Sequence, residues 1–276
     1  MTPVSGALFL TGAGALAGLV GTAGGITSLI SYPALLWVGV APLQANVANL
    51  VALVACWPGS AAASQPELRG RGPWLRRWCV VAAVGGTAGS LLLLGTPAGV
   101  FGRVVPFLVA AGSLALLLQP RVAARSAARS ARQVAGQAAG RVAGQVAGQA
   151  AGRAGSGRGS ALLPCGLLAL SVYNGYFGAG SGVLLLALLL LTTEPELVGA
   201  NALKNMVVGA ATITSAVLFA TVARVDWAAV GPLAAGLLAG SLAGPWVARR
   251  MPPSLLRWLV ALTGLALAIR LWIAPV

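Results

Sequence analysis

The stretch GLVGTAGGIT, from Gly18 to Thr27, decides the fold of this chain. It lies inside an apolar region that is long enough for a membrane helix, yet four of its ten residues are glycine. Glycine disfavours a continuous helix because it loses the most backbone freedom on folding. The stretch therefore predicts a helix that stops within a membrane region and a second, short helix that follows it.

The overall composition places the chain in a lipid bilayer. Hydrophobic residues make up 58% of the 276 residues and charged residues only 8%, which leaves too little polar surface for a soluble globular protein. Apolar stretches of roughly 18 to 20 residues, the length that spans hydrocarbon, recur from end to end. We therefore expect an all-α, polytopic protein of the cell inner membrane, without a separate soluble domain.

The apolar segments form two sets of five. The first set is Ser5–Val20, Ile26–Val40, Leu43–Ala62, Arg76–Gly95 and Phe101–Gln119. The second set, in the same order, is Ser160–Gly180, Val183–Leu191, Leu197–Thr221, Trp227–Ala248 and Leu255–Ala274. These boundaries divide the chain into a first membrane repeat (1–119), a linker (120–159) and a second membrane repeat (160–276).

Residue matches between the two halves favour a duplication. GLVGTAGGI (Gly18–Ile26) aligns without a gap on GYFGAGSGV (Gly175–Val183), and the dipeptide Ala-Asn recurs at Ala45 and Ala200. The second segment of the later half, Val183–Leu191, reaches only about half a bilayer at about 1.5 Å per residue. We therefore expect two inverted repeats, each with a glycine-broken helix pair and three spanning helices.

The arginines predict the orientation of the chain. The net charge of +14 comes from arginines at segment ends and in the linker, not beside stacking aromatics, so we expect no nucleic-acid partner. The positive-inside rule places the loop Glu67–Arg77 and the linker in the cytoplasm and both termini outside. A direct repeat fits the arginines almost as well, and the segment lengths favour the inverted arrangement. The oligomeric state stays open.

The linker carries seven arginines and no acidic residue, in a background of alanine and glycine that cannot build a core. We expect it to be solvated and to lie against anionic lipid headgroups. The arginines assigned to this contact are Arg121, Arg125, Arg129 and Arg132.

Both glycine clusters are candidates for a substrate site. A broken helix exposes the backbone amides of a helix N-terminus, which attract anions, and we expect this of Ile26, Thr27, Ser28 and Val183. The candidate binding positions are Gly21, Thr22, Gly24, Gly25 and Thr27 in the first half and Gly178, Ser181 and Gly182 in the second. The alternative is close helix packing, which fully explains Gly14, Gly18, Gly85 and Gly89.

Polar residues in the third segment of each repeat form the second candidate group. Asn46 and Asn49 in the first half correspond to Asn201 and Lys204 in the second, and Asn205 follows. Lys204 is the only lysine of the chain, and a lone cation within a membrane segment indicates function. The alternatives are that Lys204 extends to the membrane surface and that the asparagines join helices through hydrogen bonds.

The chain lacks the residues that most enzymes need. It contains no histidine, and Glu67, Glu194, Glu196 and Asp226 all lie near segment ends or in loops. We find no G-x-S-x-G or H-E-x-x-H motif and expect no cofactor, no metal site and no catalytic residues. A lipid-active membrane enzyme and a non-transporting scaffold remain the alternatives to a transporter.

The repeated break, GLVGTAGG and then GYFGAGSG, each followed by a short apolar helix and an Ala-led polar helix, resembles the TauE/SafE family of sulfite and organosulfonate exporters. This family is also described as a four-toluene-sulfonate uptake permease family. Its pattern has three consecutive glycines, whereas this chain reads Gly-Thr-Ala-Gly-Gly and Gly-Ala-Gly-Ser-Gly. The resemblance implies a membrane transporter of a small anion such as sulfite, an organosulfonate or a related sulfur oxyanion.

Overall fold

The computed structural model describes residues 3–24, 26–114, 116–118, 128, 159–194 and 196–248. All regular secondary structure in these ranges is helical. The first half contains α1 (Pro3–Gly24), α2 (Ser28–Trp37), α3 (Pro42–Ala52), the 3-10 helix η1 (Leu53–Cys56), α4 (Trp57–Leu68), α5 (Gly72–Leu94) and the helical span Ala98–Leu118. The second half contains α7 (Gly159–Tyr176), α8 (Ser181–Thr192), α9 (Leu197–Val222) and α10 (Trp227–Ala248).

Five of the described helices are long and apolar enough to cross a bilayer. They are Val4–Gly21, Pro42–Ala62, Gly72–Leu94, Ala98–Leu118 and Leu197–Val222. Shorter apolar helices include Ser28–Trp37 and Ser181–Thr192, as expected for the second segment of each half. The predicted all-α membrane class is therefore confirmed, whereas the predicted segment Leu255–Ala274 and the lipid-binding arginines of the linker lie outside the described residues.

The third segment of the first half differs from the prediction of one continuous helix. It is divided into α3 and α4 by the single 3-10 turn η1. Pro58 explains the interruption, because proline has no backbone N–H and its ring clashes with the carbonyl four residues earlier, which is that of Val54. The Val54 carbonyl instead accepts the N–H of Trp57 in a tighter turn.

The first glycine break also differs from the prediction. The sequence predicts that the helix stops across Gly21–Gly25, but α1 runs through Gly21 and ends at Gly24. Only the stretch between Gly24 and Ser28 separates α1 from α2. The propensity cost of one glycine in a helix, about 1 kcal/mol, is small enough for packing to override, and α1 is packed against α10 over much of its length.

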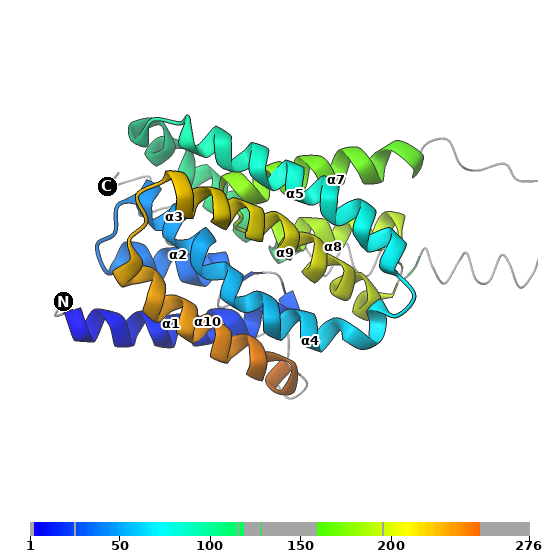
Figure 1. The fold of residues 1–276 in the computed structure, drawn as a ribbon, viewed down its shortest axis with the longest axis horizontal. Helices are drawn as coiled ribbons and strands as arrows, with labels where there is room; N and C mark the ends of the chain where they lie inside the picture. The colour runs from blue at the N-terminus through cyan, green and yellow to red at the C-terminus, as the bar shows by residue number, and fades with distance from the viewer. Residues whose placement is uncertain are drawn as a thin grey trace, which may run out of the picture.

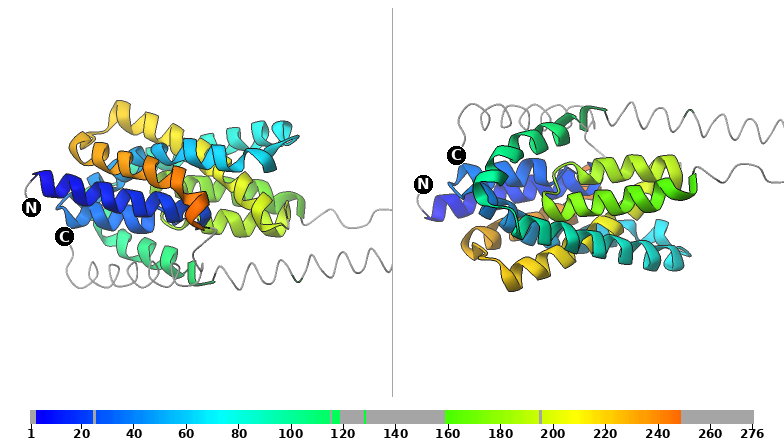
Figure 2. Two further views of the ribbon diagram at one scale, coloured as in Figure 1. Left: turned by 90° about the horizontal axis from the view of Figure 1, so that it is seen from below. Right: turned by 90° about the horizontal axis from the view of Figure 1, so that it is seen from above.

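Two helix pairs that are distant in sequence hold the bundle together. Helix α1 packs along α10, and α5 packs along α7 (Figure 2). Glycines permit both contacts: a Cβ on Gly18 would overlap the Leu237 carbonyl, and one on Gly89 would overlap the Val172 carbonyl. Each pair joins the first helix of one half to a later helix of the other half, so the two halves form one body.

Helices α1 and α7, and likewise α4 and α9, run in opposite directions. In Figure 1, α1 begins at the left end of the bundle and α7 begins at the right end. Helix α4 ends at the right end of the bundle, whereas α9 begins there. Leu35 on α2, Leu50 on α3 and Phe219 on α9 are fully buried in one hydrophobic cluster of the bundle.

Candidate functional site

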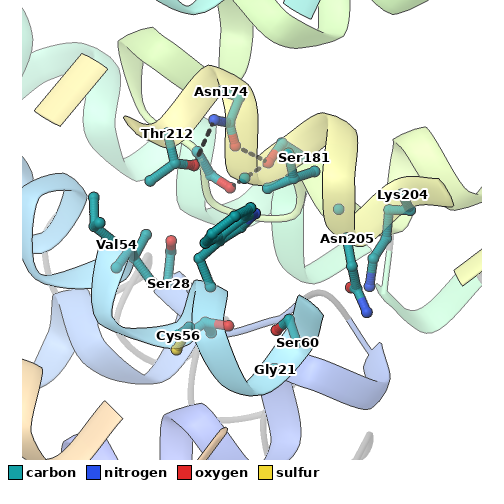
Figure 3. A pocket seen from close by; sticks show the side chains of 17 residues that line it. Gly21, Ser28, Val54, Cys56, Ser60, Asn174, Ser181, Lys204, Asn205 and Thr212 are labelled. Carbon is teal, nitrogen blue, oxygen red and sulfur yellow. Dashed lines mark hydrogen bonds between the residues drawn. The ribbon is translucent and has the colours of Figure 1, made fainter. Parts of the chain in front are cut away.

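A cavity of about 80 Å³ lies where the two halves meet. It is bordered by both helix breaks, by η1 with the start of α4, and by the middle of α9 (Figure 3). The lining residues are Gly21, Thr27, Ser28, Leu53, Val54, Cys56, Trp57, Ser60, Asn174, Gly178, Ser181, Gly182, Lys204, Asn205, Val208, Gly209 and Thr212. The cavity thus has a polar side, supplied mainly by the second half, and an apolar side, supplied by η1 and α4.

The second break has a conformation that only glycine adopts without strain. Gly178 and Gly180 have φ values of +80° and +76°, in the left-handed region that disfavours other residues. The Tyr173 hydroxyl donates to the Ala179 carbonyl at 2.6 Å and ties the loop back to α7. The break is therefore a defined turn, which ends α7 at Tyr176 and lets α8 pack back against α7.

A chain of side-chain hydrogen bonds follows this turn into the cavity. The Ser181 hydroxyl lies 2.7 Å from Asn174 Oδ1 and 2.8 Å from the Gly178 carbonyl, and it donates to these acceptors. Asn174 Nδ2 donates to Thr212 Oγ1 at 3.2 Å (Figure 3). Asn174 and Ser181 are both buried, so these bonds hold α7, α8 and α9 in one arrangement around the cavity.

The backbone amides of the second break donate hydrogen bonds within the turn, whereas the sequence predicts that they face an anion. The Val183 N–H, expected to face an anion, donates to the Gly180 carbonyl at 3.1 Å, and the Ser181 N–H donates to the Gly178 carbonyl at 3.2 Å. In this left-handed turn the carbonyls of Gly178 and Gly180 accept the first N–H groups of α8. The amide of Val183 is therefore not available as a donor in this conformation.

The first break contributes Gly21, Thr27 and Ser28 to the cavity. A Cβ on Gly21 would overlap the Thr27 side chain, so a glycine at this position lets the end of α1 approach the start of α2. Gly25 lies outside the described residues, and the placement of Thr22 and Gly24 is described for the backbone only. Residues from both breaks thus line the same cavity.

Lys204 is the notable charge of this site. Its side chain lines the cavity and is only 2% exposed, although ammonium groups are rarely buried without a partner. Its Nζ has no hydrogen-bond partner among the described residues. The neighbouring Asn205 also lines the cavity and donates from Nδ2 to Ser64 Oγ at 3.1 Å. Figure 3 shows Lys204 and Asn205 side by side at one end of the cavity.

The predicted asparagines of the first half lie away from this cavity lining. Asn46 Nδ2 donates to the Tyr176 carbonyl at 2.8 Å, and Asn49 Oδ1 accepts from the Ser31 hydroxyl at 2.5 Å. Both asparagines are fully buried and join helices, as the alternative reading of these residues allows. Asn201 is also absent from the lining residues, so of the five predicted polar positions only Lys204 and Asn205 meet at the cavity.

Several lining residues were not predicted from the sequence. Asn174 is an amide within an apolar segment, and that position is the signal that could have identified it, whereas Thr212 is one of three hydroxyl residues close together, with Thr214 and Ser215, and the sequence does not single it out. Cys56, Trp57 and Ser60 reach the cavity because Pro58 interrupts the helix beside them. Helical periodicity alone treats this segment as uniform and gives no indication of the interruption.

One protein-family model matches nearly the whole chain. The family model for the sulfite exporter TauE/SafE matches residues 7–271. No curated protein and no solved structure matches the chain. The matched region includes both helix breaks, the third segment of each half and Lys204. The chain therefore belongs to the TauE/SafE sulfite exporter family, a family of multi-pass membrane transporters and not of enzymes.

Proposed function

We propose that this protein exports a small sulfur oxyanion, such as sulfite or an organosulfonate, across the cell inner membrane and holds it in the cavity beside Lys204. The observation that carries the proposal is the buried Nζ of Lys204, which lines a cavity and has no partner among the described residues. Isolated ions in a low-dielectric interior are costly, and a bound anion removes that cost. The family match supports the choice of a sulfur oxyanion.

The cavity supplies both charge and hydrogen bonds for such a ligand. Lys204 provides an ammonium with three donors, and Asn205, Ser28 and Thr27 add neutral polar groups from both halves. A compact ammonium suits an oxyanion of variable shape because its donors rotate freely. Trp57 and Val54 form the opposite, apolar wall and limit competition from water.

The transport cycle that we propose is alternating access between two inverted repeats. The opposite directions of α1 and α7, and the pairing of α1 with α10 and of α5 with α7, support this proposal. Rocking of one repeat against the other would expose the cavity first to one side and then to the other. In this topology the linker is cytoplasmic and both termini are outside, so reporter fusions at Gly159 and at Val276 should report opposite sides.

Substitution of Lys204 tests the binding role. Lys204→Met keeps the apolar stem and deletes the charge, so folding should persist while the anion loses a charged hydrogen bond. The expected loss is about 1.5 to 3 kcal/mol, or roughly 10- to 150-fold in anion affinity. The measurement is sulfite uptake into proteoliposomes over a range of concentrations. Lys204→Arg should restore only part of the loss because the planar guanidinium needs more room.

The matched control is Arg224→Met, which deletes an exposed cation in the loop after α9 and should leave sulfite affinity unchanged. Equal thermal stability of the two purified variants separates a binding defect from misfolding. Unchanged affinity and rate for Lys204→Met would contradict the proposal.

A further inference from the structure

The interface between α4 and α9 runs from the cavity to one end of the bundle. These helices belong to different halves, pack against each other and run in opposite directions (Figure 1). Near the cavity, a Cβ on Gly209 would overlap the Trp57 ring. About one helical turn nearer the start of α9, Asn205 donates to Ser64. The interface therefore continues from the cavity toward the loop that joins α4 to α5.

Polar side chains line this interface on both helices. Ser60, Ser64 and Glu67 recur at spacings of four and three, which places them on one face of α4. Lys204 and Asn205 lie on α9, and Asn205 contacts Ser64 directly. Glu67 Oε2 is buried and has no hydrogen-bond partner among the described residues. Ser64 also donates to the Ser60 carbonyl at 2.7 Å, so the hydroxyl and amide groups supply neutral hydrogen-bond partners along the interface, and the Glu67 carboxyl lies beyond them toward the α4–α5 loop.

The opposite direction from the cavity is apolar. Leu50 and Phe219 are buried there in one hydrophobic cluster. The loops at that end add Val40, between α2 and α3, and Val225, between α9 and α10, to the same cluster. Among the described residues the polar side chains on this part of α3, Asn46 and Asn49, bond to neighbouring helices, and the surrounding side chains are mainly apolar. The two ends of the bundle therefore differ in chemistry, although they are built from corresponding segments of the two halves.

An ion pair joins two loops at the polar end. Arg71, in the loop between α4 and α5, is paired with Glu194, in the loop between α8 and α9. It is the single salt bridge among the residues that the structure describes. The Arg71 side chain is 36% exposed and that of Glu194 only 13%. Glu194 is held in place by the Glu196 N–H, which donates to Oε1 at 3.3 Å, so Arg71 is the freer partner.

We propose that the α4–α9 interface is the route between the cavity and this end of the bundle, that the Arg71–Glu194 pair closes the route, and that Arg71 contacts the anion at its end. A guanidinium binds a carboxylate and a sulfur oxyanion through the same forked donors, so a passing anion replaces Glu194 as its partner. Partly exposed ion pairs are weak enough to open in every cycle. This inference rests on the proposed function of the cavity.

Cys56 provides a natural probe of the route because it lines the cavity and carries a free thiol. In a parent chain with Cys79→Ser and Cys165→Ser, the rate of Cys56 modification by a neutral, membrane-impermeant methanethiosulfonate reagent reports access to the cavity without a bias from the charges at its end. Glu194→Gln and Arg71→Gln should each raise this rate by roughly fivefold, because each removes the ion pair. The matched control is Glu196→Gln, which makes the same charge change two residues away and should leave the rate unchanged.

The charge exchange Arg71→Glu with Glu194→Arg restores an ion pair of opposite polarity and should return the rate to within about twofold of the parent. Glu194→Asp keeps the charge on a shorter stem and should give an intermediate rate, which provides a test if a larger change prevents folding. Rates for Glu194→Gln and Arg71→Gln that equal the Glu196→Gln rate would overturn the inference. So would a charge exchange that reacts as fast as the single variants.

The thiol measurement separates this inference from the proposed function. Modification of Cys56 needs no anion binding, so it reports the route whether or not Lys204 binds sulfite. If the ion-pair variants leave the rate unchanged while Lys204→Met loses sulfite affinity, the route is wrong and the function stands. If the rate rises while Lys204→Met binds sulfite normally, the route stands and the binding role of Lys204 is wrong.

Discussion

In the second half of the chain α7 stops at Tyr176, and two glycines with positive φ turn the backbone before α8 begins. In the first half, the aligned stretch stays helical through Gly24, and α2 begins after a short connection. The aligned sequences thus give a left-handed turn after Tyr176 in one half and a helix that continues through Gly24 in the other. Asn174 and Ser181 bond to each other at the second break, whereas Ala17 and Gly24 occupy the aligned positions of the first.

The difference shows that the two halves contribute different groups to the cavity. The second half supplies the charge and most of the fixed hydrogen bonds of the cavity, through Lys204, Asn174 and Thr212. The first half supplies much of the apolar wall, through Leu53, Val54 and Trp57. An asymmetric site binds one anion in one orientation, which two identical halves could not define.

The largest expected effect tests the left-handed turn. Gly180→Ala should destabilise the protein by on the order of 2 to 4 kcal/mol, because it forces alanine to φ +76° and places its Cβ 2.8 Å from the Gly112 Cα. The measurement is the midpoint of thermal unfolding in detergent. Gly21→Ala in the first half should cost less, because Gly21 has no positive φ and lies within α1, where alanine is favoured, so only the contact with Thr27 opposes it. That contact includes the Thr27 Cα at 3.1 Å.

The control is Gly99→Ala, where the added Cβ meets open space and should not lower the midpoint. A smaller loss for Gly180→Ala than for Gly21→Ala would break the comparison between the two turns.

An intermediate effect is expected at Asn174. Asn174→Ala removes one bond to Thr212 and one from Ser181, both buried, so we expect a loss of about 2 kcal/mol in stability and a weaker affinity for sulfite. Thermal unfolding and sulfite uptake measure the two losses separately. Full stability with normal uptake would mean that the network does not hold the cavity in shape.

The smallest effect is expected at Ser31, in the first half. Ser31→Ala deletes the hydrogen bond to Asn49 and should cost about 1 kcal/mol in stability. Neither residue lines the cavity, so sulfite affinity should stay within about twofold of the parent. A tenfold loss of affinity with intact folding would place the first-half asparagines in the binding site after all and remove the asymmetry.

Much of the fold could be predicted because bilayer spanning depends on local composition. The segment order, the short second helix of each half and the unusual position of Lys204 are all readable from hydropathy and residue type. The interruption before Pro58 also depends on a local residue, the proline itself, but the long apolar run around it favours the prediction of one continuous helix. The family resemblance followed from the repeated glycine pattern, and the family match bears it out.

The sequence by itself determined that the chain is a helical membrane protein with a glycine break in each half and one lysine within a membrane segment. These properties depend on residues that are close together in the chain. Only the tertiary structure decided that Lys204 lines a cavity while Asn46 and Asn49 join helices, and that Arg71 meets Glu194. The reason is that these contacts join different halves or depend on which helix face is buried, and packing between distant segments sets both.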